Sequence, residues 1–420
     1  MDHPTTPDVV IVGAGAAGLA AARTALELGL VPLILEAKGR IGGRAFTDTT
    51  SLGVPWEQGA NWLHDVERNY FRAYADRHGF AYEPARPPRR MWRQAWASPA
   101  LATQYNDYES RAFAAVERAG AAGRDVAASE VIPVDPRWQP AFEAWFGALN
   151  GAEPARMSTL DYARAANGRN LRVEAGYGTL LAHYGRGLPV RLATTVRRIR
   201  WAGPEITLET TAGTLRAPVA VVTVSTNVLA AERIGFDPAL PLARREAFAA
   251  VPTGWAHKVA IAFSANPFGL DGPHFLDFHH RAVGFIPFEL CPFGRHLAIG
   301  HFGGRLAREI EAAGSDAAIA VALDALAEAF GESIRRQVSG AATTGWCADP
   351  HVMGGYSCAL PGKAHLRPVL AEPLGERLLF AGEACSLDAY GTVHGAHATG
   401  VAAARQAAAI LGLGQASAAR

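Results

Sequence analysis

Four residues near the N-terminus have the types and spacing of a nucleotide-binding site. Gly13, Gly15 and Gly18 follow the G-x-G-x-x-G pattern, and Glu36 ends the next apolar run. The first glycine of this pattern permits a tight turn, the second lets the backbone approach a pyrophosphate, and the third lets a helix pack closely on a strand. A carboxylate at the position of Glu36 can accept hydrogen bonds from a ribose and disfavours a 2′-phosphate. These residues predict bound FAD or NAD rather than NADP.

The chain around these residues has the pattern of a strand, a helix and a second strand. The apolar run 8–12 predicts a buried strand, 16–28 a helix that Gly29 ends, and 31–35 the second strand. In this arrangement the helix would direct its free N–H groups and the positive end of its dipole at the phosphates. The alternative is a glycine-rich turn that serves only packing.

Three later segments carry residues suited to a ligand site. Residues 37–44 contain adjacent glycines and end at Arg44, whose guanidinium can donate two hydrogen bonds to a diphosphate. Residues 57–65 combine small, aromatic and polar side chains, which is typical of a lined cavity. Lys258 stands in the alternating run 255–263 and is one of only three lysines in the chain. Such a lysine either snorkels from a strand edge or serves a buried site.

The composition limits the class of protein. A length of 420 residues, with 49% hydrophobic and 19% charged residues, is typical of a globular protein of two domains. The net charge of +1 gives no reason to expect a nucleic-acid partner. No uninterrupted apolar stretch reaches ~18 residues and the polar N-terminus lacks the apolar core of a signal peptide, so we expect no membrane span and a cytoplasmic location.

The cysteines and histidines are scattered, without the spacing of a metal site or a disulfide framework. We therefore expect no metal, and a reducing compartment is the simplest interpretation of the cysteines. No G-x-S-x-G motif is present, so hydrolase chemistry is not supported. The four cysteines are Cys291, Cys347, Cys358 and Cys385.

The middle of the chain predicts a second domain inserted into the first. Residues 105–128 and 138–150 show helical spacing of apolar side chains and interrupt the nucleotide-binding pattern. Further helices are predicted at 316–330, which is amphipathic, and at 393–411, whose small residues would allow close packing. One buried strand is predicted at 216–224.

Residues 82–100 mix proline, arginine and tryptophan, which predicts an irregular or extended segment over the surface. This segment either lies at a channel mouth or is a solvated loop with aromatic anchors. Its arginines are Arg86, Arg89, Arg90 and Arg93.

A set of motifs follows in order along the whole chain, and together they form a specific pattern. They are Gly13-x-Gly15-x-x-Gly18 with Glu36, Arg40-Ile-Gly-Gly-Arg44, Gly59-Ala-Asn-Trp-Leu-His64, Trp346-x-x-Asp349-Pro350 with Gly354-Gly-Tyr-Ser357, Phe380-Ala-Gly-Glu383 and Thr392-Val-His-Gly-Ala396. With these motifs the sequence resembles the flavin-dependent amine oxidases, the broad family of monoamine oxidases, polyamine oxidases and histone-lysine demethylases.

The resemblance implies FAD as the cofactor. Trp346 is similar to the residue that covers the flavin edge, Glu383 to the acid that bonds the ribityl chain, and the helix from 393 would direct its positive end at the flavin pyrimidine. Tyr356 stands where monoamine oxidases carry the cysteine that attaches FAD, and Cys358 lies two residues further, so we expect noncovalent FAD. The implied cofactor contacts are Gly13, Ala14, Gly15, Ala16, Gly18, Glu36, Ala37, Gly43, Arg44, Gly59, Ala60, Asn61, Trp62, Val196, Trp346, Gly382, Glu383, Thr392 and Val393.

The resemblance also implies three catalytic residues. Lys258 matches the lysine that hydrogen-bonds a water at flavin N5 and assists reoxidation, and Tyr356 matches an aromatic wall beside the flavin. His64 matches the histidine that contacts a substrate amine in polyamine oxidases, although a core histidine bonded to backbone is the alternative. Thr392 replaces the second aromatic wall of monoamine oxidases, which moves the chain towards the demethylase and polyamine-oxidase side of the family.

The expected fold is α/β, with a discontinuous Rossmann-like FAD-binding domain and an inserted α+β substrate-binding domain. We expect 1–63, 168–236 and 377–420 to form the FAD-binding domain, and 64–167 and 237–376 the substrate-binding domain.

The expected reaction is oxidation of an amine C–N bond to an imine, which hydrolyses to an aldehyde or ketone, while O2 becomes H2O2. The expected partners are a small-molecule amine and O2, with no nucleic acid or membrane, in a monomer or homodimer. Arginines of 86–93 at the entrance would favour neutral or acidic amines over polycations. The alternatives are an FAD-dependent desaturase or protoporphyrinogen-type oxidase on the same scaffold, and a non-catalytic flavoprotein that serves as an interaction scaffold.

Overall fold

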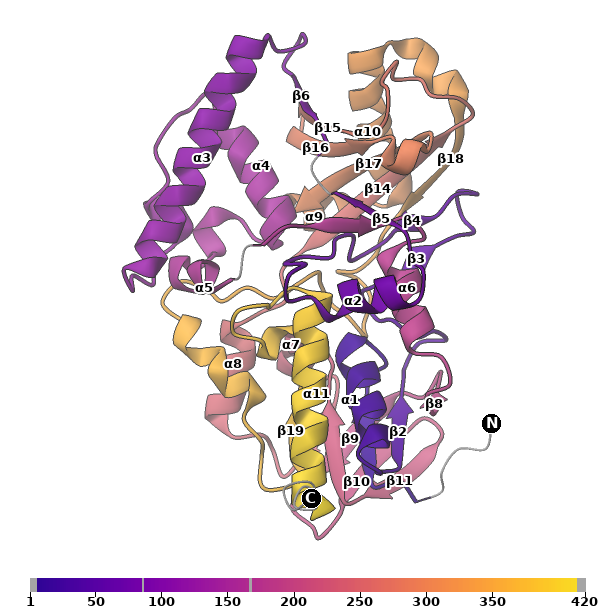
Figure 1. The fold of residues 1–420 in the computed structure, drawn as a ribbon. Helices are drawn as coiled ribbons and strands as arrows, with labels where there is room; N and C mark the ends of the chain where they lie inside the picture. Colours follow the sequence, from indigo (N-terminus) through magenta and orange to yellow (C-terminus); the bar gives the residue numbers. More distant parts are fainter. Residues whose placement is uncertain (1–5, 85–86, 166–167, 414–420) are drawn as a thin grey trace.

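The computed structural model describes residues 6–84, 87–165 and 168–413, and the lower half in Figure 1 is built around a parallel sheet. Each neighbouring pair of its five strands runs in the same direction. The β-branched residues of the first strand are all buried, as a parallel sheet covered on both faces requires. In spatial order the strands are β19 (Leu378–Phe380), β12 (Val219–Val222), β1 (Val9–Val12), β2 (Pro32–Leu35) and β8 (Val190–Arg191).

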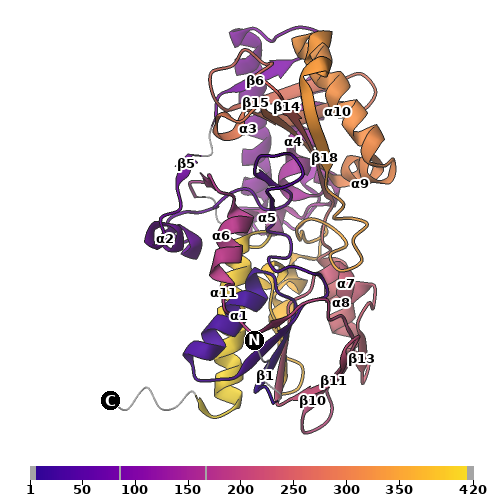
Figure 2. The same cartoon turned by 90° about the vertical axis from the view of Figure 1, so that its right-hand side faces the viewer.

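Two helices, α1 (Ala16–Glu27) and α11 (Val393–Ile410), cover one face of this sheet and lie side by side in Figures 1 and 2. Small residues allow this approach: a Cβ added at Gly400 would lie 2.1 Å from the carbonyl oxygen of Ala17. A second sheet and one helix pack on the other face. These elements are β11 (Gly213–Ala217), β10 (Ile206–Thr210), β9 (Val196–Arg200), β13 (Gly235–Asp237) and α8 (Leu242–Ala250).

The upper half contains a six-stranded sheet between two groups of helices. In spatial order its strands are β18 (Val338–Thr343), β14 (Ala256–Phe263), β17 (Leu297–Gly303), β16 (Gly284–Leu290), β15 (His274–His280) and β6 (Arg89–Trp92). The helices are α9 (Gly304–Ala312) and α10 (Ser315–Phe330) in one group, and α3 (Pro99–Ala121), α4 (Gln139–Asn150) and α5 (Thr159–Arg164) in the other. Figure 2 shows α10 on one side of the sheet and α3 with α4 on the other.

The two faces of this sheet differ in character because successive side chains point to opposite sides. Val259 and Ile261 of β14 lie in an apolar cluster with α9 and α10. Lys258 points the other way and is paired across the strands with His301 of β17. The sheet therefore carries one apolar face against α9 and α10, and an opposite face where Lys258 and His301 adjoin a smaller apolar cluster.

The remaining elements connect the two halves and are short. They are β3 (Thr47–Asp48), β4 (Trp56–Glu57), α2 (Tyr70–Arg77), β5 (Tyr82–Pro84), β7 (Leu171–Val173), α6 (Tyr177–Tyr184) and α7 (Thr226–Ala230). Short 3₁₀ helices lie at Ala128–Glu130, Pro154–Arg156, Pro292–Gly294, Glu332–Gln337, Ala364–Leu366, Pro368–Ala371 and Glu383–Cys385. Within the described ranges no helix has the length and apolar character that crossing a membrane requires.

The predicted helices at 16–28, 316–330 and 393–411 are confirmed, with ends within a residue or two of those expected. The single strand predicted at 216–224 is wrong. Pro218, which has no N–H to donate, separates β11 in one sheet from β12 in another.

The segment 82–100 is partly extended, as predicted, but one stretch of it belongs to a sheet. It contains β5, and its Arg89–Trp92 portion forms the edge strand β6 of the six-stranded sheet, parallel to β15. Arg86 lies outside the described residues.

Candidate active site

A cavity of about 920 Å³ lies where the carboxyl ends of the parallel strands meet the face of the six-stranded sheet that carries Lys258 and His301. Ligands of open α/β sheets bind at such carboxyl ends. The residues predicted from sequence that line it are Gly13, Gly15, Ala16, Glu36, Ala37, Gly43, Arg44, Gly59, Ala60, Asn61, Trp62, His64, Val196, Lys258, Trp346, Tyr356, Gly382, Glu383, Thr392 and Val393. Ala14 and Gly18 lie behind the cavity wall.

The glycine loop after β1 forms one end of this cavity. The N–H of Ala14 donates to Oε2 of Glu36 over 2.7 Å, which ties the loop to the end of β2. A Cβ on Gly18 would lie 1.9 Å from the carbonyl oxygen of Gly13, so a side chain there would force α1 away from the loop. A Cβ on Gly15 would meet no atom within 4 Å. This open side of Gly15, at the N-terminus of α1, is the space that a pyrophosphate would fill.

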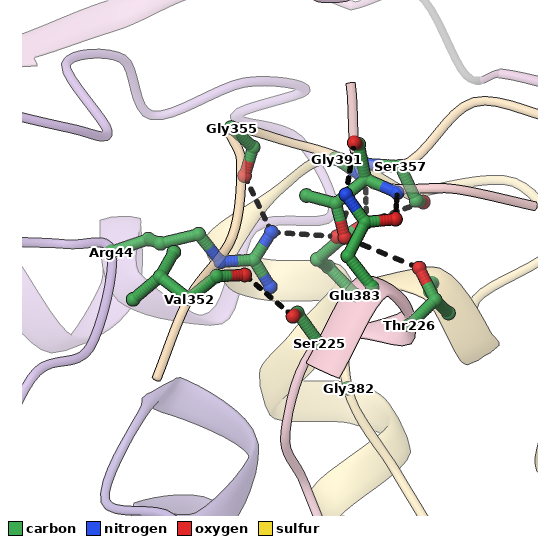
Figure 3. Close-up of polar contacts among 12 residues, drawn as sticks. Arg44, Ser225, Thr226, Val352, Gly355, Ser357, Gly382, Glu383 and Gly391 are labelled. Atoms are coloured by element: carbon green, nitrogen blue, oxygen red, sulfur yellow. Dashed lines mark hydrogen bonds and ion pairs between the residues drawn. The ribbon is translucent and has the colours of Figure 1, made fainter. Parts of the chain in front are cut away.

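The carboxylate of Glu383 connects three distant segments in the middle of the cavity wall (Figure 3). Nη1 of Arg44 donates to Glu383 over 2.9 Å and to the carbonyl oxygen of Gly355 over 2.5 Å. The hydroxyl of Ser357 and the N–H of Gly391 each donate to Oε2 of Glu383 over 2.7 Å. Burial alone would raise the pKa of Glu383, but the Arg44 charge and these hydrogen bonds hold it below its usual value.

Lys258 projects from β14 into the cavity and is held by backbone carbonyls. Its Nζ donates to the carbonyl oxygens of Glu57 over 3.0 Å and of Gly59 over 2.7 Å. Since an ammonium group has three N–H bonds, one remains available to the cavity. Burial lowers the pKa of Lys258, while the carboxyl group of Glu57 acts to raise it.

His301 lies beside Lys258, and sequence analysis missed it. Its ring stacks on that of Trp62, with centroids 6.2 Å apart and an interplanar angle of 26°. Burial, together with the charge of Lys258, lowers the pKa of His301 to about 3, so the imidazole is neutral near pH 7. The strand register that pairs His301 with Lys258 reveals its place, and that register is not visible in the sequence.

His64 lines the same cavity, and its ring lies near that of Trp62. The amide oxygen of Asn170 lies 3.1 Å from its Nδ1, so Nδ1 carries the proton and Nε2 is the acceptor of the ring. Burial lowers the pKa of His64, and the hydrogen bond to Asn170 only partly opposes this. A neutral imidazole of this kind can accept a hydrogen bond from an amine N–H.

Three further side chains predicted from sequence are held rigidly at the cavity wall. The hydroxyl of Tyr356 donates to the carbonyl oxygen of Ala148, and the indole N–H of Trp346 donates to that of Gln58 over 2.8 Å. Thr392 is the N-cap of α11, and its Oγ1 accepts a backbone N–H over 3.0 Å. The positive end of α11 therefore opens on the cavity.

The cavity extends to the helical layer, where sequence reasoning assigned no residue. Phe113 and Glu117 of α3, Tyr162 of α5 and the loop residue Asn170 all line it. Phe113 and Tyr162 are stacked, with centroids 6.3 Å apart. The sequence contained no signal for this set, because only the packing of α3 and α5 brings them to the cavity.

The described arginines of 87–93 were expected to favour neutral or acidic amines if they lined the entrance, but they are engaged elsewhere. Arg89 forms ion pairs with Asp277 and Glu109. The guanidinium groups of Arg90 and Arg93 lie over tryptophan rings. None of these three described arginines lines the cavity.

The donor set fits an extended flavin nucleotide. The loop at Gly15 can receive a pyrophosphate, Glu36 lies at the end of β2 where a ribose would bind, and the N-terminus of α11 can face the negative charge of a reduced flavin. No cysteine of the described ranges lines the cavity, and Cys358 is buried in the helical cluster instead. This arrangement suits a noncovalently held flavin.

Comparison with known proteins gives matches over nearly the whole chain. The model of the family described as flavin containing amine oxidoreductase matches residues 16–102 and 104–408. Polyamine oxidase 4 of Oryza sativa subsp. japonica is 26% identical, over 95% of this chain and 88% of its own length. Lysine-specific histone demethylase 2 of Homo sapiens is 24% identical, over 96% of this chain and 53% of its own.

Solved structures show the same fold. The cyclohexylamine oxidase from Brevibacterium oxydans IH-35A superposes with a TM-score of 0.79 at 24% identity, over 97% of this chain and 100% of that one. A double mutant of putrescine oxidase, made in a structure-based redesign of cofactor binding, gives the same TM-score and coverage at 20% identity.

Proposed function

The chain belongs to the flavin-containing amine oxidoreductases, and from this premise we propose that it oxidises a C–N bond of an amine to an imine with O2 as the final electron acceptor. The matches confirm the predicted family, α/β fold, enzyme class and FAD cofactor. Hydrolysis of the imine would give an aldehyde or ketone, and reduction of O2 would give H2O2.

The chemistry supplied by bound FAD would be two-electron acceptance from the carbon next to the amine nitrogen, with O2 as the final acceptor. The residues of the chain would do the rest. Lys258 places a cation where negative charge develops as O2 is reduced, Tyr356 walls the substrate, and neutral His64 accepts a hydrogen bond from the amine N–H. A neutral amine needs no strong protein base, which agrees with the lowered pKa of His64.

A single observation carries this proposal. The same cavity is lined by the glycine loop at Gly13 and by Lys258, Tyr356 and His64, although these residues lie far apart in the chain. A dinucleotide anchored at the loop would therefore extend towards the group of residues suited to amine oxidation.

We also propose that the substrate carries a second cationic group. Four acids line the cavity, and Glu36, Glu383 and Asp388 are engaged with backbone N–H groups or with arginine. Glu117 forms no ion pair in the described part of the chain. Its side chain is exposed on α3, where the cavity reaches the helical layer. Relatives named as polyamine oxidases and a neighbour named putrescine oxidase support this class of substrate.

A panel of amines tests the reaction. Purified protein with bound flavin is mixed with diamines, polyamines, cyclic monoamines and amino acids, and H2O2 formation is followed together with anaerobic bleaching of the flavin. We expect diamines or polyamines to bleach the flavin and to yield peroxide on admission of O2. Bleaching by no amine, combined with turnover of a polyene or tetrapyrrole, would overturn the proposal in favour of a desaturase or protoporphyrinogen-type oxidase.

The domain boundaries, a monomeric or homodimeric state and a cytoplasmic location stay predictions. The strands of the parallel sheet fall within 1–63, 168–236 and 377–420, and those of the six-stranded sheet within 64–167 and 237–376, which supports the proposed division. The four cysteines are free, which supports a reducing compartment.

A further inference from the structure

Glu57 is a buried acid that stands directly behind Lys258 and has no role in the reaction described above. It ends β4, opposite Thr47 of β3, and only 6% of its surface is exposed. Its backbone carbonyl accepts a hydrogen bond from Nζ of Lys258. The same residue therefore both holds the lysine and carries the buried carboxyl group. Burying a carboxyl group is costly unless partners compensate it.

The two carboxyl oxygens of Glu57 have different surroundings. Oε1 accepts hydrogen bonds from the hydroxyl of Thr47 over 2.8 Å and from the N–H of Gly178 over 3.4 Å. Oε2 is buried and has no hydrogen-bond partner within the described residues. A small cavity of about 20 Å³ adjoins this carboxyl group and is also lined by Thr47, Asn61, Glu289 and Arg295. It is large enough for one water, which could donate to Oε2 and stabilise the ionised form.

Most other titratable groups nearby are paired or neutral, and Arg295 is the exception. Glu289 is engaged by Arg172 and by the amide of Asn61, and His301 opposite Lys258 is neutral. Burial raises the pKa of Tyr177 on α6, so its phenol is neutral as well. Arg295 is a second cation near Glu57. These assignments leave Glu57 as the acid whose charge acts on Lys258.

We propose that Glu57 is a positioning residue that controls the charge of Lys258, holding the ammonium group protonated beside the flavin site. Lys258 makes no direct ion pair in the described ranges, so the carboxylate acts through its field in a low-dielectric interior. Burial raises the pKa of Glu57 and lowers that of Lys258, and each charge opposes the shift of the other. The pair therefore titrates as a unit, and loss of one charge makes the other harder to keep.

The charge of Glu57 changes the pH at which Lys258 loses its proton. With ionised Glu57, Lys258 keeps its proton to a higher pH. Without that charge, burial acts alone and Lys258 loses its proton at a lower pH. Any contribution of the ammonium group to O2 reduction would then disappear at a correspondingly lower pH. Only this last consequence depends on the function proposed above.

The composition of the chain allows a direct test. Because Lys38, Lys258 and Lys363 are the only lysines, labelling lysine with ¹³C at Cε gives three side-chain signals in NMR spectra of the flavin-bound protein. Lys258→Met assigns the signal of interest. The titration covers roughly pH 6 to 11, around the ordinary lysine pKa. It needs no substrate, so its failure is distinct from failure of the proposed amine oxidation.

We expect the Lys258 signal of the unmutated protein to titrate below the ordinary lysine pKa, because burial lowers it. In Glu57→Gln its midpoint should fall by about one pH unit or more, since a nearby opposite charge shifts a pKa by 1–3 units. The matched control Glu174→Gln, at an exposed glutamate, should leave it unchanged. The pH midpoint for flavin reoxidation should move with the NMR midpoint. An unchanged Lys258 midpoint in folded, flavin-bound Glu57→Gln would overturn the proposal.

A second variant decides the matter if Glu57→Gln does not fold. Thr47→Val removes the hydroxyl that donates to Oε1 and so weakens the ionised form of Glu57 without changing the acid itself. It should shift the Lys258 midpoint in the same direction by a smaller amount. A midpoint that stays in place, or moves upwards, would contradict the role of Glu57.

Discussion

At the level of single residues, the cavity places a cation, a neutral imidazole and a free carboxylate at different points along its length. Lys258 is fixed by two carbonyl oxygens, His64 by Asn170, and Glu117 stands at the helical end. Because these groups lie apart, each can be changed without removing the others. Variants of Lys258 and Glu117 therefore test the proposed oxygen step and the proposed substrate selection separately.

Lys258→Met should keep bound flavin but slow its reoxidation by O2 about a hundredfold, which is typical for removal of one group that stabilises developing charge. The lysine does not touch the glycine loop, so nucleotide binding should persist. Stopped-flow absorbance of the reduced flavin after mixing with O2 measures the rate constant. Lys363→Met, at an exposed lysine, is the matched control. Unchanged reactivity with O2 would refute the role of Lys258.

Glu117→Gln should raise KM for a diamine by a few-fold and leave KM for a monoamine of equal length unchanged, because an exposed ion pair is worth about 0.2–1 kcal/mol. Steady-state peroxide formation at several amine concentrations gives both constants. Glu376→Gln, at an exposed glutamate that does not line the cavity, should alter neither. Equal changes for the two amines would show that Glu117 does not recognise a second cation.

At the level of elements, helix termini and strand ends position the site. The N-termini of α1 and α11 both open on the cavity, and the alternation of β14 turns Lys258 away from the apolar cluster of α9 and α10. Gly15 and Gly18 illustrate the two demands on the first loop. One glycine leaves room for a ligand, and the other lets the helix touch the loop.

Gly15→Ala and Gly18→Ala should therefore fail in different ways. The new Cβ at Gly15 meets no protein atom, so stability of the apoprotein should change little while FAD affinity falls. At Gly18 the Cβ would lie 1.9 Å from a carbonyl oxygen, and overpacking of this kind costs about 1–3 kcal/mol. Urea unfolding of the apoproteins and flavin titration separate the two effects. Equal destabilisation by both substitutions would contradict this division.

At the level of the whole molecule, a buried ion pair joins the helical layer to the C-terminal part of the chain. Asp161 of α5 accepts two hydrogen bonds of 2.6 Å from Arg367, and both side chains are completely buried. Arg367 also donates to Ser357 and to the carbonyl oxygen of Ala384, next to Glu383. The cavity wall and the helical layer that contains α5 are thus tied through a single network.

Asp161→Asn should lower the free energy of unfolding by about 3–5 kcal/mol, because it leaves the Arg367 charge buried without its partner. Denaturant unfolding of the flavin-bound protein, followed by fluorescence and flavin release, measures the change. Glu332→Gln, in the exposed pair with Arg335, should leave it nearly unchanged. A change at Asp161 as small as that of the control would show that the network does not stabilise the molecule.

The dinucleotide loop was predictable from sequence because its chemistry is local. Gly13, Gly15 and Gly18 act within one turn, and Glu36 reaches the N–H of Ala14 across neighbouring strands. Lys258 stood out through its rarity and its alternating run. The motifs then carried a family resemblance that the matches confirm.

Other features were decided only by tertiary structure. The pairing of Lys258 with His301 depends on strand register. The contact between Glu57 and Lys258 depends on the packing of the β3–β4 hairpin against a sheet formed much later in the chain. Glu117 reaches the cavity only because α3 packs beside α5. Sequence patterns describe which face of an element is apolar, whereas these contacts depend on which faces meet. For this reason the sequence alone predicted the nucleotide-binding loop and the lysine, while the fold decided which acids and imidazoles surround them.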